Sequence, residues 1–418
     1  MARFLNQYNK YDKFLFILII SLIFGNFGNA FQIVRIMALL MAPSLFRKYP
    51  LCRYYSKNYV NVIRFFYCFA VLSLLWTGDK IEGLKALAYY PIHFLIFFEI
   101  LIFSKFAKNP LKTISLSWLV VVSLSLPIAL WEIMTDNHLA LSKFDSNLSL
   151  SNGLTAVKVH FAAVTFGNYN GYVTFICFAL PFLFYCLLTS EKMFYKSCCL
   201  VTIILCLVTI LFNASRGGLL SFVVMTIVYY IMTPKNVIKI ALLVLPVLYV
   251  IPFLIENGSA MFELIMMRAE DGGMLEDDVR STIWGLSIKV LLNSFGIGAG
   301  VMGTRMAMEA LKAPVTIPHN MVLEIMTDFG IVFGAIFVIY VIKLFFKARS
   351  HINTHIKVVL YMSILAMPFY LIIDSSYLLN AVYFAAFASI TVFSYIDVIR
   401  SDRTLKRRPI DVRNCNLS

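Results

Sequence analysis

Apolar runs of roughly 20 residues, the length that crosses a bilayer as a helix, recur from one end of the chain to the other. Short segments that contain Lys, Arg, Asn or Gly separate them. The pattern predicts about twelve transmembrane helices. Their expected ranges are 14–30, 31–46, 59–76, 86–103, 114–131, 172–188, 198–212, 217–232, 237–255, 321–346, 358–373 and 378–396.

The composition supports a membrane protein. Hydrophobic residues make up 60% of the 418 residues and charged residues only 14%, which is more apolar surface than a soluble core can bury. No small-residue cleavage site follows the first apolar run, so we expect that run to stay in the membrane. The first two ranges adjoin one another and could form a single re-entrant or tilted pair. Without a linker or repeat in the sequence, we expect an all-α polytopic protein with one membrane domain over residues 1–418.

The basic residues predict the orientation of the chain. With both termini in the cytoplasm, 24 of the 36 Lys and Arg residues lie in cytoplasmic segments, 10 lie outside, and Arg35 and Arg64 lie within helices. Cytoplasmic loops hold such an excess. The net charge of +14 is therefore mainly a topology signal, and it also attracts the anionic headgroups of the lipid bilayer. We expect no nucleic-acid partner, because the sequence has no basic, aromatic-interleaved soluble module.

Two external segments, 132–171 and 256–318, are long enough to carry chemistry. The second contains an acidic stretch followed by a predicted amphipathic helix over 281–292. That helix would present Ile283, Trp284, Leu286 and Val290 to the bundle or to the membrane interface. The glycines of GIGAG, at 296–300, should then end it.

The turn NASRGGLL, at 213–220, places Arg216 on the outside, against the charge bias, so an anion should meet it there. Gly217 and Gly218 allow close backbone approach and leave bare N–H groups at a helix start, which suits an anion. The alternative is an arginine that snorkels to headgroup phosphates.

Two further arginines lie in the external loop. Arg280 heads the amphipathic helix, and Arg305 follows the glycine cluster. Arg216 and Arg280 together could grip a diphosphate through forked, charge-assisted hydrogen bonds. An ion pair with the neighbouring acidic residues at 276–278 is the alternative for Arg280.

The segment IPHNMVLEIMTDFG, at 317–330, opens the predicted tenth helix with His319 and Asn320. Glu324 and Asp328, four residues apart, share one helix face and should not face lipid. The positive end of the helix dipole favours a neutral His319, which can accept a proton from a hydroxyl, and Glu324 could orient the ring. The alternative for His319 is an interfacial polar anchor.

The segment TFGNYNGY, at 165–172, places Asn168 and Asn170 at the start of the predicted sixth helix. Asparagine at a helix start is usually a cap. These two side chains could equally hydrogen-bond sugar hydroxyls.

In this order, FGNYN, SRGG, the external R...W and GIGAG, and HN..LE...D.G resemble the O-antigen ligase and O-antigen polymerase superfamily, over approximately residues 160–345. The resemblance implies a GT-C-like membrane fold and a periplasmic active site in the bacterial inner membrane, with part of that site on the loop 256–318. It implies undecaprenyl-diphosphate-linked oligosaccharide as substrate, and neither a metal nor another cofactor. A flippase and a chain-length regulator are partners that it allows.

The resemblance also implies roles for single residues. Arg216 and Arg280 match the arginines that bind the lipid diphosphate, and His319 matches the histidine that activates the acceptor hydroxyl. We assign further substrate contacts to Arg305, Asn168, Asn170, Asn320 and Glu324. The acidic residues 276–278 leave a divalent cation open as an alternative.

Three functions are compatible with these features. A polymerase joins lipid-linked repeat units, and a ligase passes the finished chain to lipid A-core. The glycine that the ligase-type histidine motif expects soon after Gly330 is displaced to Gly334, and NSF replaces a common proline before the glycine cluster. We therefore favour the polymerase. A transporter or flippase would also bury charged residues such as Arg35 and Glu99, but in a pathway at mid-membrane between two similar halves.

Overall fold

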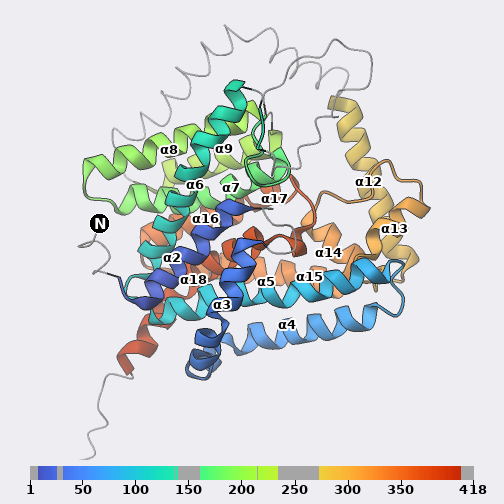
Figure 1. Ribbon diagram of the computed structural model, residues 1–418, viewed down its shortest axis with the longest axis horizontal. Coiled ribbons are helices and arrows are strands. Elements are labelled where there is room, and N and C mark those ends of the chain that lie inside the picture. Colours follow the sequence, from blue (N-terminus) through green and yellow to red (C-terminus); the bar gives the residue numbers. More distant parts are fainter. Residues whose placement is uncertain are drawn as a thin grey trace, which may run out of the picture.

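We describe the fold from a computed structural model of the chain (Figure 1). The structure describes residues 8–25, 32–135, 137–139, 161–213, 215–233 and 273–405. Within these residues the regular structure is α-helix with short 3-10 segments, so the all-α prediction is confirmed.

The α-helices are α2 (Lys10–Ile20), α3 (Ile33–Lys48), α4 (Arg53–Ser73), α5 (Lys80–Phe106), α6 (Pro110–Thr135), α7 (Tyr169–Thr189), α8 (Met193–Phe212), α9 (Arg216–Met232), α12 (Gly273–Asn293), α13 (Gly303–Ala310), α14 (Met321–Phe329), α15 (Ile331–Ser350), α16 (Thr354–Leu365), α17 (Met367–Tyr370) and α18 (Ala381–Leu405). The 3-10 helices are η1 (Ser21–Phe24), η3 (Tyr49–Cys52) and η4 (Tyr377–Leu379).

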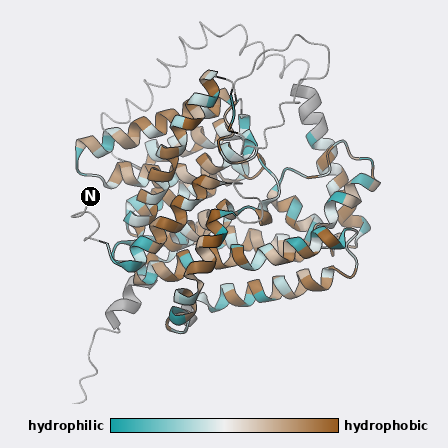
Figure 2. Cartoon of the chain, in the orientation of Figure 1, coloured by the Kyte–Doolittle hydropathy of each residue, from teal (hydrophilic) through white to brown (hydrophobic). Residues whose placement is uncertain are grey.

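Five of the described helices, α5, α6, α7, α8 and α15, are long and apolar enough to cross a membrane. Helix α9 and the segments 354–370 and 381–397 are shorter apolar helices. Apolar residues predominate along the bundle (Figure 2), which fits a polytopic membrane protein. Each predicted range overlaps a described helix except 237–255, which lies outside the described residues. The number of twelve spans stays a prediction.

Helix α7 is the centre of the bundle and packs against α6, α8, α9, α16 and α18. Its sequence is apolar on every face, which is the pattern of a helix buried all round. The side chains of Phe175, Phe178, Phe182 and Phe184 are almost completely buried. Trp118 of α6 stacks on Phe182, with ring centroids 5.7 Å apart.

Helices α12 and α13 lie beside the bundle, at the right of Figure 1. Helix α12 starts earlier than the predicted 281, and its apolar face is the expected one. Ile283 and Val290 are buried against Met308 of α13, and Trp284 and Leu286 pack on the same cluster. Because α12 also contacts α14, this pair of helices is attached to the segment that carries His319.

The predicted tenth helix over 321–346 is wrong in one respect, because the structure breaks it into α14 and α15 at Gly330. Gly330 has a positive φ of 87°, and a Cβ there would lie 2.5 Å from the Gly296 carbonyl oxygen. The Ile331 N–H donates to Gly296 O at 2.9 Å, and the Ala299 N–H donates to Thr327 O at 2.7 Å. The glycine cluster therefore ends α12, as predicted, and also fills the break between α14 and α15.

Candidate active site

The residues between α17 and α18, 371–380, form a loop that we call the outer loop. Two backbone N–H groups of this loop, those of Ser376 and Tyr377, donate to the two carboxylate oxygens of Glu324, each at 3.1 Å. The Tyr377 hydroxyl donates to the Leu371 carbonyl at 2.6 Å. Ser376 has a φ of 58°, which is unusual for a residue other than glycine. Glu324 thus holds the loop in a conformation that its own sequence does not favour.

The segment that carries His319 is attached to the start of the same loop. The Met321 N–H donates to the Leu371 carbonyl at 3.1 Å, and Asn320 caps α14 by accepting from the N–H groups of Val322 and Leu323. His319 is half-buried, with a φ of 46°. It immediately precedes Asn320, the N-cap of α14.

Helix α12 carries Arg280 near the outer loop. The charge of Arg280 lies close enough to the Tyr377 hydroxyl to act on it electrostatically. One turn further along the helix, the Trp284 indole N–H donates to the Pro318 carbonyl at 3.0 Å. Arg280 and His319 are therefore held on either side of one short contact between α12 and the start of α14. The side chains of residues 276–278, the alternative partners of Arg280, lie outside the described residues.

Arg216 begins α9 and is exposed. The Ser215 hydroxyl caps this helix by accepting from the Gly218 N–H at 3.2 Å. A Cβ at Gly217 would lie 2.8 Å from the Phe369 carbonyl oxygen, and one at Gly218 would lie 2.6 Å from Val173. The two glycines do allow close approach, as predicted, but to α17 and α7. Their packing places Arg216 next to the segment that leads into the outer loop.

The start of α7 meets the outer loop at Asp374. Asn168 caps α7 by accepting from the Gly171 N–H at 2.6 Å, and its side chain also hydrogen-bonds the Asp374 carboxylate. Asp374 is only 6% exposed. A Cβ at Gly171 would lie 3.4 Å from the Asp374 carboxylate. Asn170 follows on the first turn of α7 and is half-buried. Asn168 is thus a helix cap, which is the usual role of asparagine at a helix start, and it also contacts Asp374 of the outer loop.

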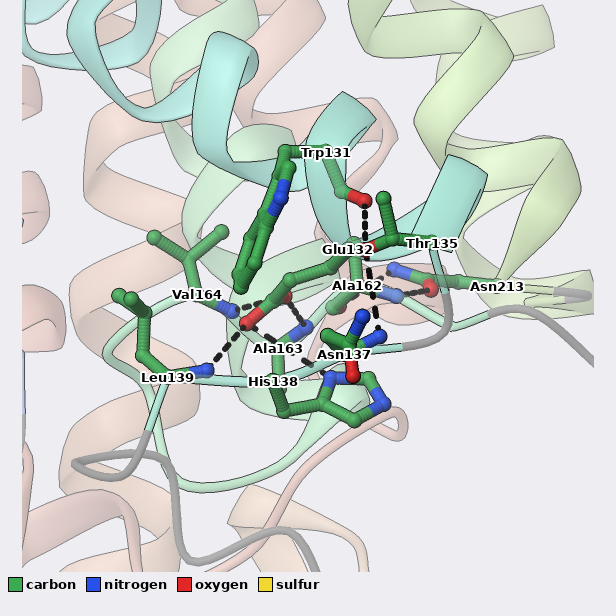
Figure 3. Close-up of polar contacts among 10 residues, drawn as sticks. All are labelled: Trp131, Glu132, Thr135, Asn137, His138, Leu139, Ala162, Ala163, Val164 and Asn213. Carbon is green, nitrogen blue, oxygen red and sulfur yellow. Dashed lines mark hydrogen bonds and ion pairs between the residues drawn. The ribbon is translucent and has the colours of Figure 1, made fainter.

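The segment before α7 is held by Glu132 at the end of α6 (Figure 3). The buried Glu132 carboxylate accepts from the N–H groups of Ala163 at 2.8 Å and Val164 at 2.7 Å. Asn213, before Arg216, binds both the N–H and the carbonyl of Ala162, at 2.7 and 3.0 Å. These contacts connect the ends of α6 and α8 to the segment that leads to Asn168.

Two other sequence candidates lie away from the outer loop. Asp328 accepts from the N–H of Thr304 at 3.0 Å and also from its hydroxyl, so it anchors the start of α13. Arg305 is 68% exposed and pairs with Glu309, at 3.3 Å, on the surface of α13. Glu324 and Asp328 share one face of α14 and both contact protein, as predicted.

Three buried carboxyl groups, those of Glu324, Asp328 and Asp374, have a raised pKa. Burial, followed by the charge of Asp328, raises the pKa of Glu324 to about 8. Burial raises the pKa of Asp328 and of Asp374 to about 6. Helix α14 and the outer loop lie outside the helices that meet the length and composition of a membrane span. Raised carboxyl pKa values are typical of functional sites as well as of buried structural groups.

Some features of the site could not be assigned from the sequence. Neither Asp374 nor Glu132 had a predicted role in glycan transfer. Among the described residues, no group of three or more His, Cys, Asp and Glu side chains could hold a metal ion. A groove of about 450 Å³ between Trp76, α12 and α13 is lined by residues such as Asn293 and Gly303, beside the glycine cluster rather than beside the outer loop.

Comparison with known proteins agrees with the motifs. Residues 201–339 match the O-antigen ligase family, a range that contains Arg216, Arg280 and His319 but neither Asn168 nor the outer loop. Over 287 residues the chain is 23% identical to the teichuronic acid biosynthesis protein TuaE of Bacillus subtilis strain 168. That alignment covers 66% of this chain and 57% of the relative, so the chain spans little more than half of that protein.

The proteins of the matched family are bacterial cytoplasmic-membrane proteins that transfer glycans in polysaccharide biosynthesis. The apolar helices of this chain and its resemblance in SRGG and HN..LE agree with that assignment. Residues 201–339 of the chain are therefore similar to the O-antigen ligase family.

Proposed function

We propose that this protein is a surface-polysaccharide polymerase that joins undecaprenyl-diphosphate-linked repeat units on the periplasmic face of the bacterial inner membrane. The observation that carries the proposal is the convergence on the outer loop. Elements that bear Asn168, Arg216, Arg280 and His319 are far apart in the sequence, yet each contacts or acts on residues 369–377. Two cations, a histidine and an amide around one loop suit the transfer of a sugar from a diphosphate.

The transfer follows from this set of groups. The bond between the anomeric carbon and the diphosphate oxygen breaks, and its electron pair leaves with the polyprenyl diphosphate. Arg216 and Arg280 stabilise the negative charge that develops there, because cations already in place need no reorganisation. The acceptor hydroxyl oxygen forms the new bond from the opposite side of the ring, which inverts the anomeric configuration, and His319 takes the hydroxyl proton.

The remaining candidates have supporting roles in the proposal. Asn168, the N-cap of α7, and Asn170, on its first turn, contact the acceptor sugar. Asn320 fixes the start of α14, and Glu324 fixes the outer loop. Both residues also contact the substrate in this proposal. Arg305 is a contact for the glycan at the edge of the external helices. No metal or cofactor is needed for these steps, since Arg216 and Arg280 carry the positive charge.

The proposal includes a topology. We place both termini in the cytoplasm and the outer loop, with α12 to α14, on the periplasmic side, in one membrane domain whose loop 256–318 carries part of the active site. The substrate reaches this face by a flippase, and a chain-length regulator is the partner that would set the extent of polymerisation.

A reconstitution tests the polymerase directly. The purified protein, in proteoliposomes, is given undecaprenyl-diphosphate-linked repeat unit alone, and the products are resolved on a gel. A ladder of lipid-linked oligomers is the expected result. If the repeat unit is consumed only when lipid A-core is added, the protein is a ligase, the second candidate, which the description of the matched family favours. Movement of intact substrate across the bilayer without a new glycosidic bond would instead identify a flippase.

A further inference from the structure

Two buried side chains from the first half of the chain hold the far end of the outer loop. Arg35 of α3 donates from Nη2 to the Leu379 carbonyl at 3.2 Å. Nδ1 of His93, on α5, lies 2.9 Å from the Leu378 carbonyl. Arg35 is 5% exposed and His93 is fully buried. The two residues also contact one another, with 3.1 Å between Arg35 Nε and His93 Nε2.

The contact between Arg35 and His93 determines which neutral tautomer the histidine adopts. The Arg35 Nε–H group can only donate, so His93 Nε2 must be the acceptor. The ring proton is therefore on Nδ1, from which it is donated to the Leu378 carbonyl. Only one neutral tautomer satisfies both contacts. The Arg35 guanidinium also lies over the Tyr89 ring, 4.2 Å from its centroid, which keeps the guanidinium in place.

The second half of the outer loop is consequently held by two kinds of contact to adjacent residues. Glu324 accepts from the N–H groups of Ser376 and Tyr377, while Arg35 and His93 donate to the carbonyls of Leu378 and Leu379. All three side chains bind backbone groups in or beside η4, which is a single helical turn. Asp374 lies only four residues before Leu378, so a displacement of that turn is transmitted to the carboxylate that contacts Asn168.

We propose that Arg35 and His93 are positioning residues of the glycan-transfer site, which they serve through the outer loop. The proposal rests on the proposed function and deepens it, because it assigns a role to α3 and α5. A misplacement of about 1 Å at a reacting group can lower the rate by roughly 100-fold. Loss of either contact should therefore lower kcat more than it changes the affinity for the lipid diphosphate, whose arginines lie on α9 and α12.

Two substitutions at one position separate positioning from mere folding. In His93→Gln, the side-chain amide can still accept from Arg35 and donate to the Leu378 carbonyl. His93→Leu can do neither. A matched control is His351→Leu, because His351 is also buried and contacts a backbone carbonyl, that of Ser394, at 3.0 Å. It lies after α15, at the opposite end of that helix from α14.

The assay is transfer in proteoliposomes with undecaprenyl-diphosphate-linked repeat unit, normalised to folded protein by size-exclusion chromatography. We expect His93→Leu to lower kcat roughly 10- to 100-fold with the donor KM within about twofold, and His93→Gln to keep at least about half of the wild-type kcat. His351→Leu should leave kcat unchanged. Equal kcat for His93→Leu and wild type, or failure of His93→Gln to rescue, overturns the proposal.

Hydrogen exchange of the peptide 371–380 gives a readout that does not depend on activity. We expect exchange to be at least about tenfold faster in His93→Leu than in His93→Gln or in wild type. If the wild type transfers no glycan but the loop exchanges as expected, the proposed function fails while the contact stands. Unchanged exchange in His93→Leu overturns the positioning role itself.

Discussion

The hydrogen bonds from the outer loop to Glu324 lead to a quantitative prediction for Glu324→Gln. The carboxylate accepts from two backbone N–H groups at 3.1 Å, but a glutamine amide has a single acceptor oxygen. At a pH above the Glu324 pKa of about 8, where the side chain is a carboxylate, the substitution removes one charge-assisted bond and turns an NH₂ group toward one of the N–H donors. Leaving a buried donor unsatisfied costs about 1–3 kcal/mol, so the loop should open roughly 5- to 150-fold more often.

Hydrogen exchange at the Ser376 and Tyr377 amides measures this opening. The control is Glu309→Gln, which removes a carboxylate that is 51% exposed and paired with Arg305 on the surface. Such a surface pair contributes about 0–1 kcal/mol, so exchange in the outer loop should stay at the wild-type rate. Exchange at the two amides that changes by less than about twofold in Glu324→Gln would show that Glu324 does not hold the loop.

Three further predictions concern the break in the helix, the pH dependence of stability and the diphosphate site. Gly330→Ala places a Cβ 2.5 Å from the Gly296 carbonyl oxygen, at a residue whose φ is 87°. We expect the free energy of unfolding to fall by about 3 kcal/mol or more. Size-exclusion chromatography should then show little folded protein. Burial raises the pKa of Glu324 to about 8, above its value of about 4.3 in the unfolded chain. The protonated Glu324 side chain therefore contributes stability that is fully present below about pH 4.3. This stability is lost as the pH rises through about 8. The midpoint of thermal unfolding should fall over this window in the wild type and more weakly in Glu324→Gln; an equal fall in both would contradict the assignment. Arg216→Lys keeps the charge but loses the guanidinium fork, so the donor KM in proteoliposomes should rise by roughly tenfold, and an unchanged KM would leave Arg216 without a role in binding the diphosphate.

Apolar periodicity predicted most helices well because their boundaries depend on local chemistry. The predicted 172–188 and 217–232 correspond to α7 and α9, each of which starts after a side-chain cap, Asn168 or Ser215. The break at Gly330 could not be predicted in this way. Apolar residues continue across it, and the groups that stabilise it come from the glycine cluster 34 residues earlier, at Gly296.

The sequence singles out the charged residues of the candidate site but not the geometry that the structure gives them. Arg216, Arg280 and His319 stand out in the sequence because a charged or polar residue at the outer end of an apolar run needs a reason. The outer loop has no comparable signal, since Ile372, Ile373, Leu378 and Leu379 resemble the ends of two apolar helices. Its conformation depends on Glu324, 52 residues away in the chain, and on Arg35, 344 residues away from Leu379.

The most direct test of the account is the activity of His319→Ala in the proteoliposome assay, beside wild type and Glu309→Gln. A positioned general base contributes about 10²- to 10⁴-fold. We therefore predict that wild type and Glu309→Gln form a ladder from undecaprenyl-diphosphate-linked repeat unit, and that His319→Ala, although folded, forms it at least about 100-fold more slowly. A full ladder from His319→Ala at the wild-type rate would contradict the central claim that this histidine, held beside the outer loop, activates the acceptor.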